Sequence, residues 1–167
     1  MNDFFPTDDY KLPTSSNYMT FKSPGDYTFR VLSSAIVGYQ YFTKDNKPVR
    51  SKAVFDEMPD DIKQGGRVNH FWAFVVWNYE DEKVQVMELT QKTIMTPMQA
   101  LIKNPKWGNP KEYDITITRK GTGMNDTEYA VMPNPHAKVS EGVVSTYNNK
   151  KVHLEALFDN GDPFSQE

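Results

Sequence analysis

The amino-acid sequence predicts a mainly β protein: a five-stranded barrel with one helix between its third and fourth strands, an N-terminal arm and an acidic C-terminal tail. Several short segments alternate apolar and polar residues with the period of two that is typical of strands. The helical period of about 3.6 is clearest in one segment, residues 91–104. Strands and helices do not alternate as they would in a parallel α/β sheet.

The first strand is predicted to be long and bent. DYTFRVLS, residues 26–33, continues as AIVGYQYFT, residues 35–43, and Gly38 indicates a bend or bulge. The segments 70–79 and 83–90 are expected to form a hairpin around a polar turn.

The helix over residues 91–104 follows this hairpin. Its start, or a restart, is expected at Pro97, because Thr96 to Gln99 has the pattern of a capping box with proline at the first helical position. EYDITITRK, residues 112–120, and TEYAVM, residues 127–132, are the last two predicted strands.

This order of elements is that of the OB (oligonucleotide/oligosaccharide-binding) fold. A bent first strand fits, because it must pair with both halves of a small barrel. We therefore divide the chain into an N-terminal arm (1–26), an OB-fold domain (27–138) and a C-terminal segment with the acidic tail (139–167).

Several classes of function are not expected from the composition. The chain has no cysteine, and its three histidines lack the spacing of metal ligands, so neither a metal site nor a cofactor is predicted. No phosphate-binding glycine loop, nucleophile elbow or histidine–glutamate metal motif is present, so we expect a protein that is not an enzyme. No apolar run approaches the roughly 20 residues that span a membrane, so a soluble, intracellular protein is expected.

The distribution of charge is compatible with a polyanionic partner. The net charge is −3, of which residues 1–26 carry −2 and residues 154–167 carry −4. Residues 27–153 therefore carry +3. A mildly basic body with acidic ends permits nucleic-acid binding without requiring it.

The segment HFWAFVVWNY, residues 70–79, is apolar on both faces, since Trp72 and Phe74 share one face while Phe71 and Trp77 share the other. In an OB fold one face fills the barrel, and the other lies on the outer platform of the second and third strands. Nucleobases stack on exposed aromatic rings there with little sequence preference. At most one of Trp72 and Trp77 is then a platform residue. The alternative, in which the arm covers the outer face, stays open.

The candidate nucleic-acid-binding residues are aromatic side chains for stacking and basic side chains for phosphate contacts. The aromatic set is Tyr39, Tyr41, Trp72, Trp77 and Tyr79. The basic set is Lys44, Lys47, Arg50, Lys52, Arg67, Arg119 and Lys120, which lie in or beside the two loops expected to flank the platform. Taken alone, each basic residue fits a solvated surface charge better than a phosphate contact, and the Tyr39/Tyr41 pair fits half-buried amphipathic packing equally well.

Four segments resemble a family of bacteriophage single-stranded DNA-binding proteins with an OB fold. They are NYMTFKSPGDYTFRVLSSAIVGYQYFT, HFWAFVVWNYEDEKVQVMELTQKTI, WGNPKEYDITITRKGTG and EYAVMPNPH, and together they run from about Asn17 to His136. The resemblance implies non-catalytic coating of single-stranded DNA during phage replication, recombination or repair, in the cytoplasm of the infected bacterial host.

The tail LEALFDNGDPFSQE combines acids with Phe158 and Phe164. In proteins of this kind such tails dock replication or recombination proteins, or occupy the empty basic groove. Here the acids are sparser than in those tails. Two alternatives remain: an OB-like protein-interaction module, such as an adaptor or inhibitor, that uses the same apolar strand, and an RNA-binding OB protein.

Overall fold

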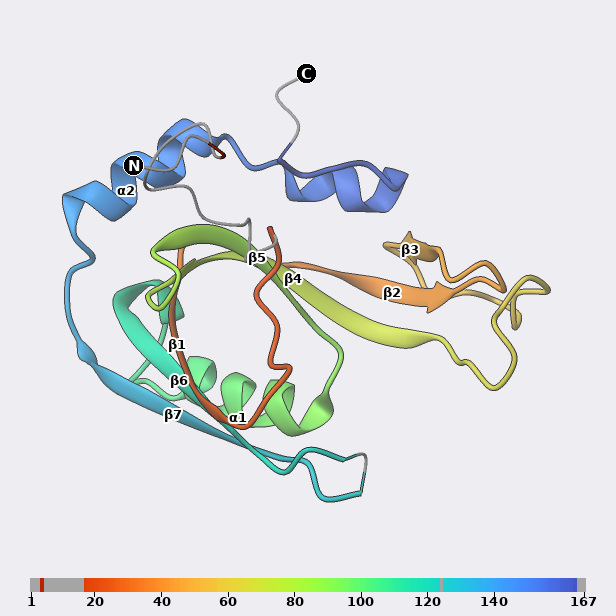
Figure 1. The fold of residues 1–167 in the computed structure, drawn as a ribbon, viewed down its shortest axis with the longest axis horizontal. Helices are drawn as coiled ribbons and strands as arrows, with labels where there is room; N and C mark the ends of the chain where they lie inside the picture. The colour runs from red at the N-terminus through yellow and green to blue at the C-terminus, as the bar shows by residue number, and fades with distance from the viewer. Residues whose placement is uncertain (1–3, 5–16, 124, 165–167) are drawn as a thin grey trace.

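The computed structural model describes residue 4 and residues 17–123 and 125–164 of the chain (Figure 1). It is mainly β, with a seven-stranded antiparallel sheet and two α-helices. The strands are β1 (Gly25–Val31), β2 (Ile36–Phe42), β3 (Pro48–Ser51), β4 (Asn69–Asn78), β5 (Lys83–Leu89), β6 (Tyr113–Lys120) and β7 (Glu128–His136). The helices are α1 (Lys92–Lys103), α2 (Glu141–Lys150) and the 3-10 turns η1 (Pro110–Glu112) and η2 (Leu154–Asp159).

Strand β4 is the centre of the sheet. One of its edges pairs with β5, and the other pairs with β2 near its start and with β1 near its end. Strands β1 and β2 are thus the two halves of the predicted bent strand. The bend lies between them at residues 32–35, and not at Gly38, which is inside β2. Gly38 is needed for close packing instead, because a Cβ there would lie 2.5 Å from the carbonyl oxygen of Ser51.

The sheet is open and does not close into the predicted barrel. Hydrogen-bonded neighbours follow the order β5-β4-β1-β6-β7, and a pairing of β5 with β7 would complete the ring. The edge of β5 is occupied by the N-terminal segment, where Val86 accepts a hydrogen bond from the Met19 amide (2.9 Å) and donates one to the Asn17 carbonyl (2.8 Å). Met19 and Phe21 are buried in the core beside this edge.

Three element boundaries differ from the sequence prediction. Strand β3 forms within the predicted loop 44–52. Strand β7 continues beyond residue 132 through Pro133 and Pro135. Both prolines are tolerated because β7 is at the edge of the sheet, where a missing N–H breaks no ladder. Helix α1 begins at Lys92 and passes through Pro97 rather than starting there, since Ile94, Met95 and Met98 on either side of the proline are buried.

The inner face of the sheet curves around α1 (Figure 1). The core between them contains Phe29, Phe74, Val76 and Ile94, all at most 3% exposed. Of the apolar residues that recur with the helical period in α1, Ile94 and Met98 are buried, whereas Ile102 is 38% exposed. Among the described residues, no helix has the length and apolar character needed to cross a membrane.

The C-terminal segment covers the opposite face of β4. Figure 1 shows α2 and η2 lying across the sheet on the side away from α1. Leu157 of η2 is 1% exposed and packs with Phe71 and Ala73 of β4, and the Phe158 ring centroid lies 5.9 Å from that of Phe71. The apolar strand is therefore buried on both faces along most of its length, and its outer face is covered by the C-terminal segment together with Tyr18. Most of the N-terminal arm, the alternative cover for this face, lies outside the described residues.

We expect Gly38→Ala to lower the free energy of unfolding by about 1–3 kcal/mol, because the new methyl group overlaps the β3 backbone. Gly142→Ala is the matched control: its Cβ meets nothing within 4 Å on α2. Alanine there should be neutral or stabilise by up to about 1 kcal/mol. Urea unfolding followed by circular dichroism measures both variants. Equal stabilities would show that β2, β3 and the C-terminal segment do not pack as described.

Candidate nucleic-acid interface

An aromatic surface forms where β2, β3 and the start of β4 project beyond the core, a part we call the projecting hairpin (Figure 1). Tyr39 pairs directly with His70, and Val37 with Trp72, so these four side chains share one face. The ring centroids of Tyr39 and His70 lie 5.0 Å apart with an interplanar angle of 49°. We call these four residues the aromatic face.

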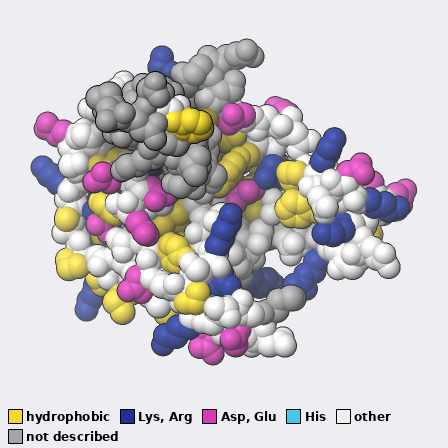
Figure 2. All heavy atoms as spheres, in the orientation of Figure 1, with side chains coloured by type: hydrophobic (Ala, Val, Ile, Leu, Met, Phe, Trp, Pro, Cys, Tyr) yellow, Lys and Arg dark blue, Asp and Glu magenta, His cyan; other side chains and the backbone are white. Residues whose placement is uncertain are grey.

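Trp72 also forms one wall of a groove between the projecting hairpin and the first turns of α1. This Trp72 groove has a volume of about 980 Å³. Its walls are about equally polar and apolar, and they include two exposed basic residues, Arg67 and Lys92. Figure 2 shows a hollow between the body and the projecting hairpin, with Lys and Arg side chains at its margin. The groove therefore combines an indole ring with cationic groups, and proteins that bind single-stranded nucleic acid use both.

The five aromatic residues predicted for the site do not lie together. Tyr39 and Trp72 lie on the aromatic face, and Trp72 is half-buried at the margin of the core. Tyr41 is 6% exposed, with its hydroxyl donating to Asp61 (2.8 Å), so its ring offers no surface for stacking. Trp77 is half-buried on the opposite face of β4. Tyr79 lies just beyond the far end of β4, about 30 Å from His70 at 3.3 Å per residue.

Three of the predicted basic residues have partners within the protein. Arg50 makes a two-point ion pair with Glu88 (2.8 and 3.1 Å), and its side chain is 9% exposed. Arg119 donates to the carbonyl of Phe21. Lys52 is ion-paired with Glu155 of η2 (3.0 Å). These contacts neutralise or occupy the cations on which phosphate binding would depend.

The other four predicted basic residues, Lys44, Lys47, Arg67 and Lys120, are exposed. Lys44 and Lys47 lie in the turn between β2 and β3, at the end of the projecting hairpin. Lys120 is at the end of β6, beside the β6–β7 loop, where Glu128 faces it across the ladder. Of the four, Arg67 is the one that lines the Trp72 groove.

Sequence reasoning missed His70, Lys92 and Lys63. His70 and Lys92 line the Trp72 groove, and Lys63 lines a smaller hollow of about 420 Å³ that it shares with Arg67. His70 could have been found from its place on the same strand face as Trp72, two residues away. Lys92 carries no such signal, because its approach to β4 depends on how α1 folds back under the sheet.

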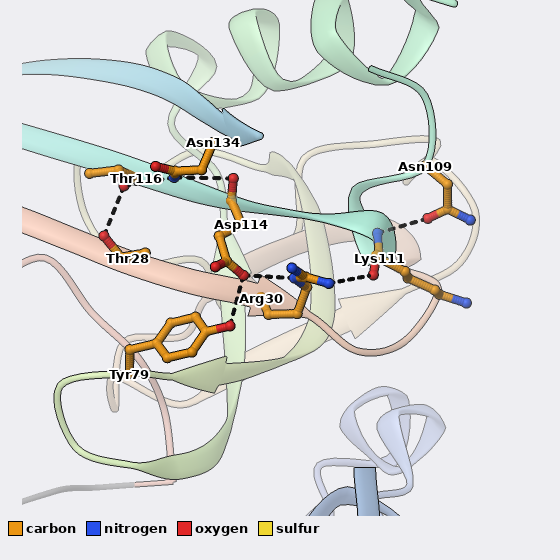
Figure 3. Close-up of polar contacts among 8 residues, drawn as sticks. All are labelled: Thr28, Arg30, Tyr79, Asn109, Lys111, Asp114, Thr116 and Asn134. Atoms are coloured by element: carbon orange, nitrogen blue, oxygen red, sulfur yellow. Dashed lines mark hydrogen bonds and ion pairs between the residues drawn. The ribbon is translucent and has the colours of Figure 1, made fainter. Parts of the chain in front are cut away.

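Tyr79 belongs to a polar network at the far end of β4 and not to the groove (Figure 3). Its hydroxyl donates to Asp114 Oδ1 (2.8 Å), which also accepts from Arg30 Nε (2.7 Å). Burial raises the pKa of Tyr79 to about 12, helped by the hydrogen bond to Asp114 and by the charge of that carboxylate. The predicted stacking residue is thus used to join β4 to β6.

This pKa gives a test at alkaline pH. Between its unfolded pKa of 10.0 and its folded pKa of about 12, Tyr79 is protonated in the folded chain but ionised in the unfolded one. The stability it contributes is therefore complete below pH 10 and is lost as pH rises through about 12. We expect Tyr79→Phe to unfold with a shallower loss of stability over that range, measured by urea unfolding at several pH values. An unchanged slope would contradict the described contact with Asp114.

Comparison with known proteins finds a relative in Escherichia phage T5, described as a "Probable ssDNA-binding protein". The two chains are 36% identical over 89 residues, which cover 50% of this chain and 33% of the relative. The match thus spans about a third of the length of that protein. No protein-family model and no solved structure matches the chain. The resemblance to phage single-stranded DNA-binding proteins that was drawn from the sequence is confirmed by this relative.

Proposed function

We propose that this protein binds single-stranded DNA with little sequence preference and without catalysis. The observation that carries the proposal is the Trp72 groove, where a half-buried indole lies beside Arg67 and Lys92. The relative from phage T5, described as a probable single-stranded DNA-binding protein, supports the same function.

In the proposed complex, bases stack against Trp72 and against the Tyr39–His70 pair of the aromatic face. Each such stack contributes about 1–3 kcal/mol and accepts any base, because every base has a π face. Arg67 and Lys92 contact phosphates within the groove, and these contacts make affinity fall as salt rises.

The strand order supports an OB fold in the partly open form. Each neighbour relationship in β5-β4-β1-β6-β7 is one that an OB barrel contains, and the pairing that differs is the closing one. In OB folds the loop after the first strand and the loop between the last two strands flank the ligand. Here these are residues 43–68, which include β3, and residues 121–123 and 125–127, and Figure 1 shows both at the side of the molecule where the hairpin projects.

The biological setting is part of the proposal and is supported by the phage origin of the relative. Coating of single strands during phage replication, recombination or repair would take place in the cytoplasm of the infected bacterial host. Docking of replication or recombination proteins is proposed for only a part of residues 154–167. Leu157 and Phe158 already pack on β4, so a partner would have to use the remaining, polar part of that segment.

The alternative of a protein-interaction module is not supported, because the surface it would use for docking is covered. It required the outer apolar face of residues 70–79 as a docking site, but Phe71 and Ala73 are covered by η2 and fully buried. The RNA-binding alternative concerns the same groove, and competition between DNA and RNA oligomers of one sequence separates the two ligands.

Titration of intrinsic tryptophan fluorescence with oligo-dT tests the proposed function. We expect saturable quenching that weakens as salt rises. Trp72→Ala should reduce the affinity about 5- to 100-fold, because the stacking surface in the groove is lost. Trp77→Ala should change it less than twofold, since this residue lies on the opposite face of β4. Absence of any complex in a parallel gel shift would overturn the proposal. Equal losses of affinity in the two variants would show that the DNA does not bind in the Trp72 groove.

A second titration tests the phosphate contacts. Arg67→Gln should weaken oligo-dT binding to a similar degree for all sequences and lower the slope of log affinity against log salt by about 0.7. Lys151→Gln removes one positive charge just after α2, over the opposite face of β4, and should leave the slope unchanged. If both variants shift the slope equally, the effect of Arg67 is one of overall charge and not of a contact.

A further inference from the structure

A second hollow lies on the other side of Trp72. Its volume is about 400 Å³, and it is bounded by the bend between β1 and β2, the second half of α1 and the segment around η1. Its walls are mainly apolar and include Phe74, Met98 and Ile102. This size and lining are those of pockets that accept small flat molecules. We call it the bend pocket.

The bend pocket has a cationic group at its margin. Lys111 Nζ donates to Ser34 Oγ (3.2 Å), and both residues are exposed and line the pocket. An ammonium group has three hydrogens to donate, so this bond leaves capacity for an anion. A hollow that is apolar inside and cationic at its edge suits a ligand with a flat body and an adjacent negative charge.

The backbone of Lys111 is held in place by two side chains, of which Arg30 is buried (Figure 3). Its carbonyl accepts from Arg30 Nη1 (3.1 Å), and its amide donates to Asn109 Oδ1 (3.0 Å). Arg30 is 2% exposed and is itself fixed by Asp114 (2.7 Å). The lysine therefore starts from a rigid base, which lowers the entropic cost of holding its ammonium group beside a ligand.

We propose that the bend pocket receives one unstacked nucleobase of the same strand that lies in the Trp72 groove. This inference rests on the proposed function. The supporting observation is that the two hollows are adjacent, since Trp72 lines both of them. A DNA strand that passes the Trp72 indole in the groove therefore reaches the bend pocket next. The base fills the apolar interior, and Lys111 contacts the phosphate beside it. Trp72 thus separates the base stacked in the groove from the base held in the pocket.

A large side chain introduced at the margin of the bend pocket tests whether a base binds there. Ala35 is exposed and lines the pocket, so Ala35→Phe places a ring where the base would lie. We expect it to weaken oligo-dT binding about tenfold, as for the loss of one base contact. Ala130→Phe, on the exposed side of β7, is the matched control and should bind as the wild type does. Thermal melting confirms folding, and Ser34→Phe replaces Ala35→Phe if the latter is unstable.

An oligomer of abasic deoxyribose phosphates of equal length separates base from phosphate contacts. Ala35→Phe should bind the abasic oligomer as tightly as the wild type does. Lys111→Gln should bind both the abasic oligomer and oligo-dT more weakly, and Lys151→Gln is its control. Binding of oligo-dT by Ala35→Phe within twofold of wild type would overturn the inference. So would an equal loss on the abasic strand. Failure of the proposed function itself is distinguishable, since the wild-type protein would then not bind oligo-dT.

Discussion

The two-faced burial of β4 is the constraint on which the rest of the structure depends. Its inner residues fill the core against α1, and its outer residues Phe71 and Ala73 are fully buried under η2. A strand that is apolar on both faces needs a second covering layer, because exposed apolar surface costs about 25 cal/mol per Å². The C-terminal segment supplies that layer. On the inner face, the start of β4 extends past α1, and there His70 and Trp72 line the groove.

Internal ion pairs decide which cations are left for a ligand. Arg30 and Arg50 are nearly buried and hydrogen-bonded to Asp114 and Glu88, so they stabilise the sheet and are removed from the surface. Lys52 and Glu155 are 69% and 65% exposed, and such a pair contributes at most about 1 kcal/mol. Basic loops therefore cannot be counted as binding loops by charge alone. Arg67 and Lys92 matter because both line the same groove as Trp72.

Local periodicity was enough to predict the order of the strands other than β3 and the helix between the hairpin and β6, because those patterns reflect which residues face the core. Closure of the barrel was not predictable in this way. It depends on which segment pairs with the edge of β5, and the residues around Met19 that do so have no clear period. The preference for Trp72 over Trp77 in the proposed site likewise depends on the C-terminal segment, which has little pattern of its own and covers one face of β4. His70 and Lys92 line the same groove only because tertiary packing brings β4 and α1 together.

Trp72 links stability to the proposed binding. Its indole packs against the core cluster that contains Phe74 and Met98, and it also borders both hollows. A ring held this way is already ordered, so a base that stacks on it need not also restrict a mobile side chain, which costs about 0.5–1.5 kcal/mol elsewhere. The same contact makes the groove sensitive to α1, since loosening Met98 frees the indole on its core side. The aromatic surface is therefore rigid for the same reason that the fold is stable: one face of β4 is core at one end and the proposed binding surface at the other.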